Sequence, residues 1–248
     1  MKIEVPYAFQ TEFSVEDGKV YWCKESTEKK SHYNIAQIHV TGQDQASHHG
    51  GKHSHSCACD SLTYIGHEWT DSTLHITLQD EKMRAVYHYQ FYKDIAAVRA
   101  WVTVTALSEI GLEYVASLAL TGLAGETVLV AHNSWCEEGH WQRYTLTEAG
   151  LSCANIFSTK RILISNTGHW STKEYLPMGA LEGDQTYLWQ IENNGSWMWE
   201  LSTVQTGLYL HLSGPTEREH SWYKHLQPGE TFDSVPAVLT VAAGLLPN

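Results

Sequence analysis

Histidine and cysteine concentrate in one short stretch of the chain, SHHGGKHSHSCACD at residues 47–60. Imidazole nitrogen and thiolate sulfur are ligands that zinc and copper prefer. However, the one-residue gaps of His53-x-His55 and Cys57-x-Cys59 match no structural zinc pattern and strain two ligands onto one tetrahedral ion. The glycines and serines favour a polar loop at the edge of a folded domain. We therefore expect no metal ion and no other cofactor.

A carboxylate and an imidazole lie two residues apart at Glu138 and His140. Such a pair could act as acid and base around a sugar ring. The competing interpretation is an exposed, hydrogen-bonded turn. The sequence favours the turn.

Aromatic residues with a polar tip are unusually frequent, with 10 Trp, 13 Tyr and 15 His against 5 Phe and 4 Met. These side chains combine an apolar face with a hydrogen-bonding group, which suits the alternating apolar and hydroxyl surfaces of a sugar. Trp135, Trp141 and Trp170 lie among turn residues, where they could stack on a sugar or face another domain. Domain contacts are enriched in such anchors, so we favour the second interpretation.

Period-2 alternation of apolar and polar residues dominates the rest of the chain and predicts β-strands. In MRAVYHYQF, from Met83 to Phe91, every second residue is apolar or aromatic, and AVRAWVTVTAL continues the pattern from Ala97. Trp101, Trp189, Trp197 and Trp199 fall within such runs and are interpreted as sheet-packing residues. No segment of ten or more residues has convincing helical periodicity. The sequence predicts an all-β fold with few or no helices.

Turn dipeptides separate these strands, at Asp17-Gly18, Asn194-Gly195 and Pro228-Gly229. Asn194-Gly195 lies between TYLWQIE and SWMWELS, and this combination predicts a β-hairpin. No repeat and no glycine- or proline-rich linker marks a boundary. We therefore expect one large antiparallel sandwich over residues 1–248.

Charge and cysteine content restrict the partners and the compartment. The net charge is −12 with only 16 basic residues, which argues against nucleic acid. No stretch approaches the length of a membrane span, and the first residues lack the pattern of a signal peptide. Five cysteines in a chain of this size are interpreted as reduced thiols. We expect a cytoplasmic protein.

Several longer segments resemble glycoside hydrolase family 36, the α-galactosidases and their relatives. They are GLEYVASLALTGL, AHNSWCEEGHWQRYTL, ISNTGHWSTKEYLPMGALE, and the stretch from Gly183 to Pro236. HHGGKHS and HYQFY are similar to the same region of the family. The resemblance extends over nearly the whole chain and is to the N-terminal β-supersandwich domain of the family.

This resemblance implies a fold of two large antiparallel sheets packed face to face. In full-length members a (β/α)8 barrel follows, and it carries the two aspartates that cleave α-galactosides with retention. The chain reaches Asn248 at the close of the sandwich, so neither aspartate can be placed and no catalytic residue is assigned. We expect a domain taken from a longer polypeptide.

The resemblance also implies that loops of the sandwich reach the rim of the sugar pocket. The candidate substrate-binding residues are His49, Lys52, His53, Trp135 and Trp170. The expected role is to pack on the barrel, shape the rim and support a homo-oligomer. The alternatives are a stand-alone galactoside-binding module and a mutarotase-like epimerase, which would share the fold and use Glu138 and His140.

Overall fold

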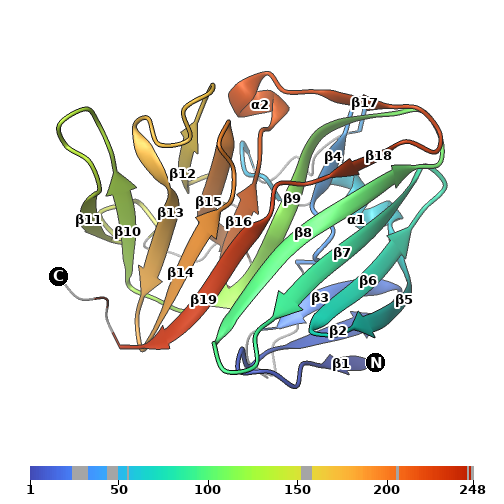
Figure 1. Cartoon of the computed structure of the whole chain (residues 1–248), viewed down its shortest axis with the longest axis horizontal. Helices are drawn as coiled ribbons and strands as arrows, with labels where there is room; N and C mark the ends of the chain where they lie inside the picture. The colour runs from blue at the N-terminus through green and yellow to red at the C-terminus, as the bar shows by residue number, and fades with distance from the viewer. Residues whose placement is uncertain are drawn as a thin grey trace.

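Two large β-sheets pack face to face in the computed structural model of the chain, which describes residues 1–23, 33–43, 50–54, 56–151, 158–204, 207–244 and 246. Figure 1 looks onto the ten-stranded sheet, with much of the nine-stranded sheet behind it. Pairing is antiparallel except at one contact between β3 and β9. The expected all-β supersandwich is confirmed. None of the described helices is long and apolar enough to cross a membrane.

The nine-stranded sheet runs in the order β1-β2-β3-β9-β16-β15-β12, and β4 and β17 also pair with β9. Its strands are β1 (Lys2–Glu4), β2 (Glu12–Glu16), β3 (Lys19–Cys23), β4 (Ile38–Val40), β9 (Ile110–Leu123), β12 (Arg161–Asn166), β15 (Trp197–Val204), β16 (Gly207–Ser213) and β17 (Lys224–Leu226).

The ten-stranded sheet runs in the order β11-β10-β13-β14-β19-β8-β7-β6-β5, and β18 also pairs with β8. Its strands are β5 (Thr63–Thr70), β6 (Thr73–Gln79), β7 (Met83–Phe91), β8 (Ala97–Ala106), β10 (Thr127–His132), β11 (His140–Thr145), β13 (Tyr175–Glu182), β14 (Gln185–Ile191), β18 (Thr231–Asp233) and β19 (Ala237–Ala243). Two short helices, α1 (Cys57–Ser61) and α2 (Glu217–His220), complete the described structure.

The core lies between the sheets and follows the alternation of the sequence. In β7 every second residue from Met83 to Phe91 is buried, while the residues between them are partly exposed. Trp189, Trp197 and Trp199 are fully buried, as expected of sheet-packing residues. Trp101 differs, because it lies on the outer face of β8 and is only partly buried.

The hairpin predicted at Asn194-Gly195 is wrong. The strand before the turn, β14, pairs with β13 and β19 in one sheet, whereas the strand after it, β15, pairs with β12 and β16 in the other. The connection therefore crosses between the two layers. All eight positions of β15 are buried, so other parts of the chain must pack on both of its faces. A hairpin with β14 would place a strand beside β15 and would cover neither face. The Asp17-Gly18 turn does join a hairpin, between β2 and β3.

The outer face of the nine-stranded sheet is covered by further chain around β15 and β16. Tyr33 and Tyr209 stack there with ring centroids 5.1 Å apart, in a small second cluster with Ala116, Ala119 and Val204. Residues 50–54 cross the same face. This cover buries the polar side chains that point outward from β15 and β16.

Candidate functional site

A buried carboxylate, Glu200 on β15, is the centre of a polar cluster beneath residues 50–54. One oxygen, Oε1, accepts hydrogen bonds from the backbone N–H of His53 at 2.9 Å and from the Tyr209 hydroxyl. The other, Oε2, accepts from His53 Nδ1 and from Arg161 Nη1, each at 2.9 Å. The Glu200 side chain is 0% exposed. Each of the two carboxylate oxygens thus accepts two hydrogen bonds.

These hydrogen-bond donors stabilise the negative charge of Glu200. Burial alone raises the pKa of a carboxyl group, but here hydrogen bonds from His53 and Tyr209 and the neighbouring imidazoles outweigh it and lower the pKa to about 2. The group is therefore ionised at neutral pH. A buried ion of this kind is tolerated only while all of its partners remain in place.

His211 on β16 adjoins this carboxylate as a neutral imidazole. Burial, reinforced by the charge of His53, lowers the pKa of His211 to about 3. Its Nδ1–H donates to the His53 carbonyl oxygen at 3.0 Å. The Nε2 atoms of His53 and His211 have no hydrogen-bond partner among the described residues, and the Tyr114 ring lies edge-on to both imidazoles.

Lys52 and His53 are buried against the outer face of the nine-stranded sheet, each 1% exposed. The Lys52 ammonium donates to the Thr203 carbonyl oxygen at 2.7 Å, and burial lowers the pKa of Lys52 although the Glu200 charge opposes that shift. Both residues therefore fasten residues 50–54 to the sheet. Their contact with a sugar stays a prediction. His49, the third residue predicted in this loop, lies outside the described residues.

Two arginine side chains form hydrogen bonds with the same loop on the side where α2 lies. Arg161 and Arg218 both donate to the Gly51 carbonyl oxygen, and Arg161 also reaches Glu219 at 3.3 Å. Gly50 has a φ of +59°, and a Cβ there would come within 2.9 Å of Thr159. The first glycine of HGGKH is thus required by backbone conformation and by space.

A small cavity lies between this loop, α2 and the ends of β4 and β9. Its volume is about 30 Å³, room for one water molecule. The lining residues are His39, His53, Glu113, Tyr114, Glu217 and Arg218. The cavity is too small for a sugar, so we interpret the Glu200 cluster as support for the fold.

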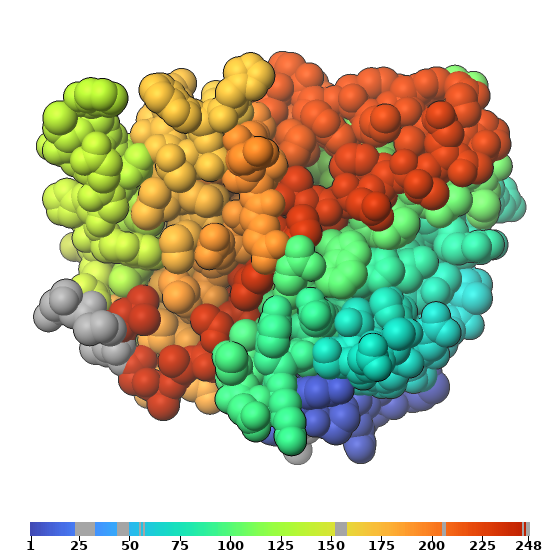
Figure 2. Space-filling view, in the orientation of Figure 1, coloured from blue at the N-terminus to red at the C-terminus, as the bar shows by residue number. Residues whose placement is uncertain are grey.

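Three loops lie together at one end of the sandwich and form what we call the rim, defined as residues 133–139, 167–174 and 192–196. The N–H of Asn133 donates to the Glu174 carbonyl at 2.8 Å, and the N–H of Gly168 donates to the Ser196 hydroxyl at 3.0 Å. Figure 2 shows the first two loops projecting at the top left of the molecule. Helix α2 lies beside them at the same end (Figure 1).

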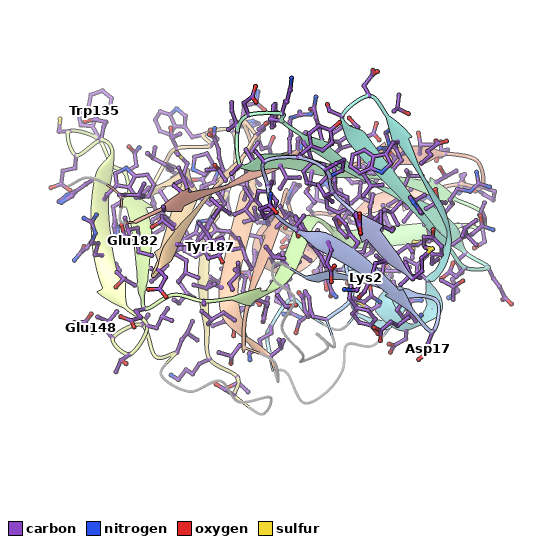
Figure 3. The ribbon with its side chains drawn as sticks, turned by 90° about the horizontal axis from the view of Figure 1, so that it is seen from below. Lys2, Asp17, Trp135, Glu148, Glu182 and Tyr187 are labelled. Atoms are coloured by element: carbon purple, nitrogen blue, oxygen red, sulfur yellow. The ribbon has the colours of Figure 1, made fainter. Side chains whose placement is uncertain are left out.

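Two tryptophans of the rim are the most exposed large aromatic side chains described. Trp135 is 86% exposed and Trp170 is 67% exposed. Figure 3 places Trp135 at the tip of the β10–β11 hairpin, well away from Lys2 and Asp17 at the other side of the molecule. Trp141, in β11, is partly buried. A groove of about 700 Å³ between residues 171–178 and 190–194 adjoins the rim.

Glu138 and His140 lie on the same hairpin and are both exposed. The Glu138 carboxylate accepts from the backbone N–H of Cys136 at 3.1 Å, within the turn itself. This geometry fits the exposed turn that the sequence favours.

The histidine- and cysteine-rich segment is only partly described. His48, His49 and His55 and the side chain of Cys57 lie outside the described residues. Cys59 is in α1 rather than in a loop, and burial raises the pKa of its thiol to about 12. Among the described residues, no three or more His, Cys, Asp or Glu side chains gather closely enough to hold a metal ion.

Sequence reasoning missed the partners of His53, which are Glu200, Arg161, His211 and Tyr33. One signal was available in the run WMWELS, where a single carboxylate interrupts a buried apolar strand. A charged residue in such a strand is expected to have a buried partner. The identity of that partner, 147 positions away in the sequence, could not be read from the pattern.

Comparison with known proteins gives matches at the level of structure. No family model matches the chain, and no curated protein matches its sequence. Among solved structures, the family 36 α-galactosidase AgaA from Geobacillus stearothermophilus matches with a TM-score of 0.74 and 12% identity, over 98% of this chain and 41% of that one. The α-galactosidase from Lactobacillus brevis matches with a TM-score of 0.72 and 14% identity, over 98% of this chain and 39% of that one.

The galactosidase domain of the α-galactosidase–sucrose kinase AgaSK also matches, with a TM-score of 0.67 and 17% identity, over 94% of this chain and 39% of that one. The chain therefore spans about two-fifths of the length of these enzymes. At this level of identity the likeness concerns the fold. The chain has the fold of a domain that occurs within family 36 α-galactosidases, as the sequence resemblance implied.

Proposed function

We propose that this chain is the non-catalytic N-terminal domain of an α-galactosidase-like glycoside hydrolase, which packs on a catalytic barrel and shapes the edge of its sugar pocket. The observation that carries the proposal is the match of 98% of this chain to 41% of AgaA. In the intact enzyme a second part would then supply the catalytic carboxylates.

The buried carboxylates support a non-catalytic role. Retaining hydrolysis needs two carboxyl groups about 5–5.5 Å apart on either side of a glycosidic bond. Glu200 is closed in by its donors, and the Glu182 side chain, 3% exposed, is paired with Arg143 at 3.1 Å. Both carboxylates are engaged in ion pairs within the domain, so neither is free to act as a nucleophile or an acid.

The rim supports docking on a further domain. Trp135 and Trp170 expose large apolar surfaces at the same end of the sandwich. An aromatic anchor of this kind is typical of the central residues of protein interfaces. We propose that the barrel covers these two indoles.

Substrate, assembly and compartment extend the proposal. AgaA variants have been crystallised with raffinose and with stachyose, so we propose that the intact protein acts on α-galactosides. The resemblance to family 36 is the basis for proposing that it also forms a homo-oligomer. The free thiol of Cys136 is exposed, and an exposed free thiol fits the reducing cytoplasm.

The test compares this chain alone with a longer product that includes the gene region after codon 248. Only the longer product should hydrolyse p-nitrophenyl α-galactoside, and Trp135→Ala with Trp170→Ala should weaken its activity or its assembly. Tyr223→Ala, at a residue 51% exposed outside the rim, is the matched control. Hydrolysis by the isolated chain, or a gene without a barrel after this region, would overturn the proposal.

A stand-alone galactoside-binding module is the second candidate, favoured by the same exposed indoles. It predicts calorimetric binding of melibiose by the isolated chain, abolished by Trp135→Ala or Trp170→Ala. The domain proposal predicts no measurable heat in that titration.

A further inference from the structure

A row of polar side chains crosses the outer face of the ten-stranded sheet, away from both the rim and Glu200. Glu68, His75, His88 and Trp101 occupy directly opposite positions on the neighbouring strands β5, β6, β7 and β8. These strands lie side by side at the right of Figure 1. Side chains directly opposite each other on one face of a sheet are close enough to act together.

The two histidines of this row point their Nδ1 atoms at one another, 2.6 Å apart. On its other side, His88 Nε2 lies 3.0 Å from the Thr103 hydroxyl, and that hydroxyl donates to Asp233 Oδ1 at 2.6 Å. Since the Thr103 proton is directed to Asp233, its oxygen must accept from His88 Nε2–H. His88 Nδ1 therefore carries a lone pair, directed at His75.

The surroundings keep His88 neutral. Burial lowers the pKa of His88 to about 4, although Asp233 opposes the shift. Trp101 stacks on the imidazole with ring centroids 4.8 Å apart and planes 12° from parallel. The chain His88–Thr103–Asp233 is the arrangement that fixes the tautomer of metal-binding histidines, in which the second ring nitrogen donates to a polar partner.

A sugar fits this row poorly. Trp101 already carries the His88 imidazole against its ring, and the Arg99 guanidinium lies over the same indole at 5.2 Å from the centroid. An aromatic platform for a sugar needs a free face. Two convergent imidazole nitrogens on a partly exposed surface instead suit a small cation.

We propose that His75 and His88 bind a divalent transition-metal ion through their Nδ1 atoms, with Cu²⁺ held most tightly and Zn²⁺ next. Imidazole nitrogen suits both ions, and Cu²⁺ has the higher intrinsic affinity. To bind, His75 must present the lone pair of Nδ1 to the ion and carry its proton on Nε2.

The geometry needs a small adjustment and leaves open positions. Metal–nitrogen bonds of about 2.0–2.1 Å in a tetrahedral site place two nitrogens roughly 3.3 Å apart, so the rings must separate by somewhat less than 1 Å. No third His, Cys, Asp or Glu completes a metal-sized cluster among the described residues. The remaining coordination positions are open to water.

The experiment titrates tag-free protein with Cu²⁺ and Zn²⁺ chlorides in a calorimeter. The double variant His75→Gln, His88→Gln should bind one equivalent fewer than the unchanged chain. The segment at residues 47–60 contains further histidines, so the difference in stoichiometry between the two proteins is the quantity measured. The control is His67→Gln, His225→Gln, which replaces two exposed histidines outside the row and should keep the equivalent.

A positioning variant tests the role of Thr103. Thr103→Val preserves the shape of the side chain but removes the acceptor of His88 Nε2–H, so the affinity should fall by roughly 10-fold. Circular dichroism of each variant establishes that it is folded. Equal affinity in Thr103→Val would remove the hydrogen-bond chain from the proposal, and equal stoichiometry in the double variant would overturn the site.

Spectra of the imidazoles give a second readout, which follows each histidine separately. In long-range ¹H–¹⁵N spectra of the imidazoles, with signals assigned by single His→Gln variants, the Nδ1 resonance of His88 should have the shift of an unprotonated nitrogen before metal is added. The His75 and His88 signals should both move on addition of Zn²⁺. Unchanged His75 and His88 signals at saturating Zn²⁺ would overturn the proposal.

Discussion

Two histidine networks, one on the outer side of each sheet, end on a carboxylate but differ in their access to solvent. His53 bonds directly to Glu200 under residues 50–54, and its side chain is 1% exposed. His88 reaches Asp233 through Thr103 on a partly exposed face, and Asp233 itself is exposed.

The same residue types serve different purposes in the two networks, depending on whether a segment distant in the sequence packs over them. Where a segment buries the carboxylate, its charge must be matched by hydrogen-bond donors, and the histidine then stabilises the fold. Where no segment packs over the network, the fixed tautomer of His88 leaves a nitrogen lone pair that a solute can reach. The comparison separates a network that stabilises the domain from one that is available for binding.

The largest expected effect is the loss of the buried carboxylate charge. Glu200→Gln leaves Arg161 and His53 without their anionic acceptor, so the free energy of unfolding should fall by about 3–5 kcal/mol. Urea denaturation measures this loss of stability. Asp233→Asn, at the end of the exposed network, should cost less than about 1 kcal/mol. Equal losses in the two variants would remove the distinction between the networks.

Lys52 provides the next test of the covered side. Lys52→Met keeps the length of the side chain but removes the donor to the Thr203 carbonyl, which then lies buried without it. We expect a loss of about 1–3 kcal/mol in the same denaturation assay. Lys93→Met, at an exposed lysine, should stay within about 0.5 kcal/mol of the unchanged chain. An unchanged or increased stability in Lys52→Met would indicate that burying the ammonium costs as much as its hydrogen bond contributes.

The pH dependence of stability should reflect His211. Its pKa is lowered from 6.5 to about 3 in the folded chain, so below pH 6.5 the unfolded state takes up a proton that the folded state does not. Stability is therefore present above pH 6.5 and is lost as the pH falls toward 3, with a slope of up to about 1.4 kcal/mol per pH unit from this group.

His211→Gln should remove that part of the slope. His88, whose pKa is also lowered, contributes in the same direction and remains in the variant. The loss from Glu200 lies lower, between its usual pKa of 4.5 and about 2. Urea midpoints measured from pH 7 to 4 give the result, and an unchanged slope in His211→Gln would show that this imidazole is not buried in the neutral form.

The smallest expected effect on stability is at the rim. Trp135→Ala removes an indole that is 86% exposed, so the free energy of unfolding of the isolated chain should change by no more than about 0.5 kcal/mol. A loss above 1 kcal/mol in thermal or urea unfolding would show that the indole packs within this chain and would weaken its role as a docking anchor.

The strands could be predicted from the sequence because their period is a local property. Met83–Phe91 alternates in the sequence and in its burial, and the Asp17-Gly18 turn joins neighbouring strands as its residue types indicate. Asn194-Gly195 has an equally strong turn signal but joins strands of different sheets. A turn dipeptide reports the local reversal of the chain and carries no information about which sheet receives the next strand.

The candidate residues divide in the same way. The exposure of Trp135 and Trp170 follows from their place among turn residues, which the sequence shows. Lys52 and His53 also lie in a polar glycine-rich stretch, yet they are buried. Their surroundings depend on Glu200 and Thr203, which are some 150 positions later in the chain.

The amino-acid sequence by itself determined the all-β class, the inward face of most strands and the resemblance to an α-galactosidase domain, because alternation and residue choice are set strand by strand. Only the tertiary structure decided which polar side chains are covered and which remain open. Burial depends on the segment that packs above a residue, and that segment is brought there by the order of strands in the sheets.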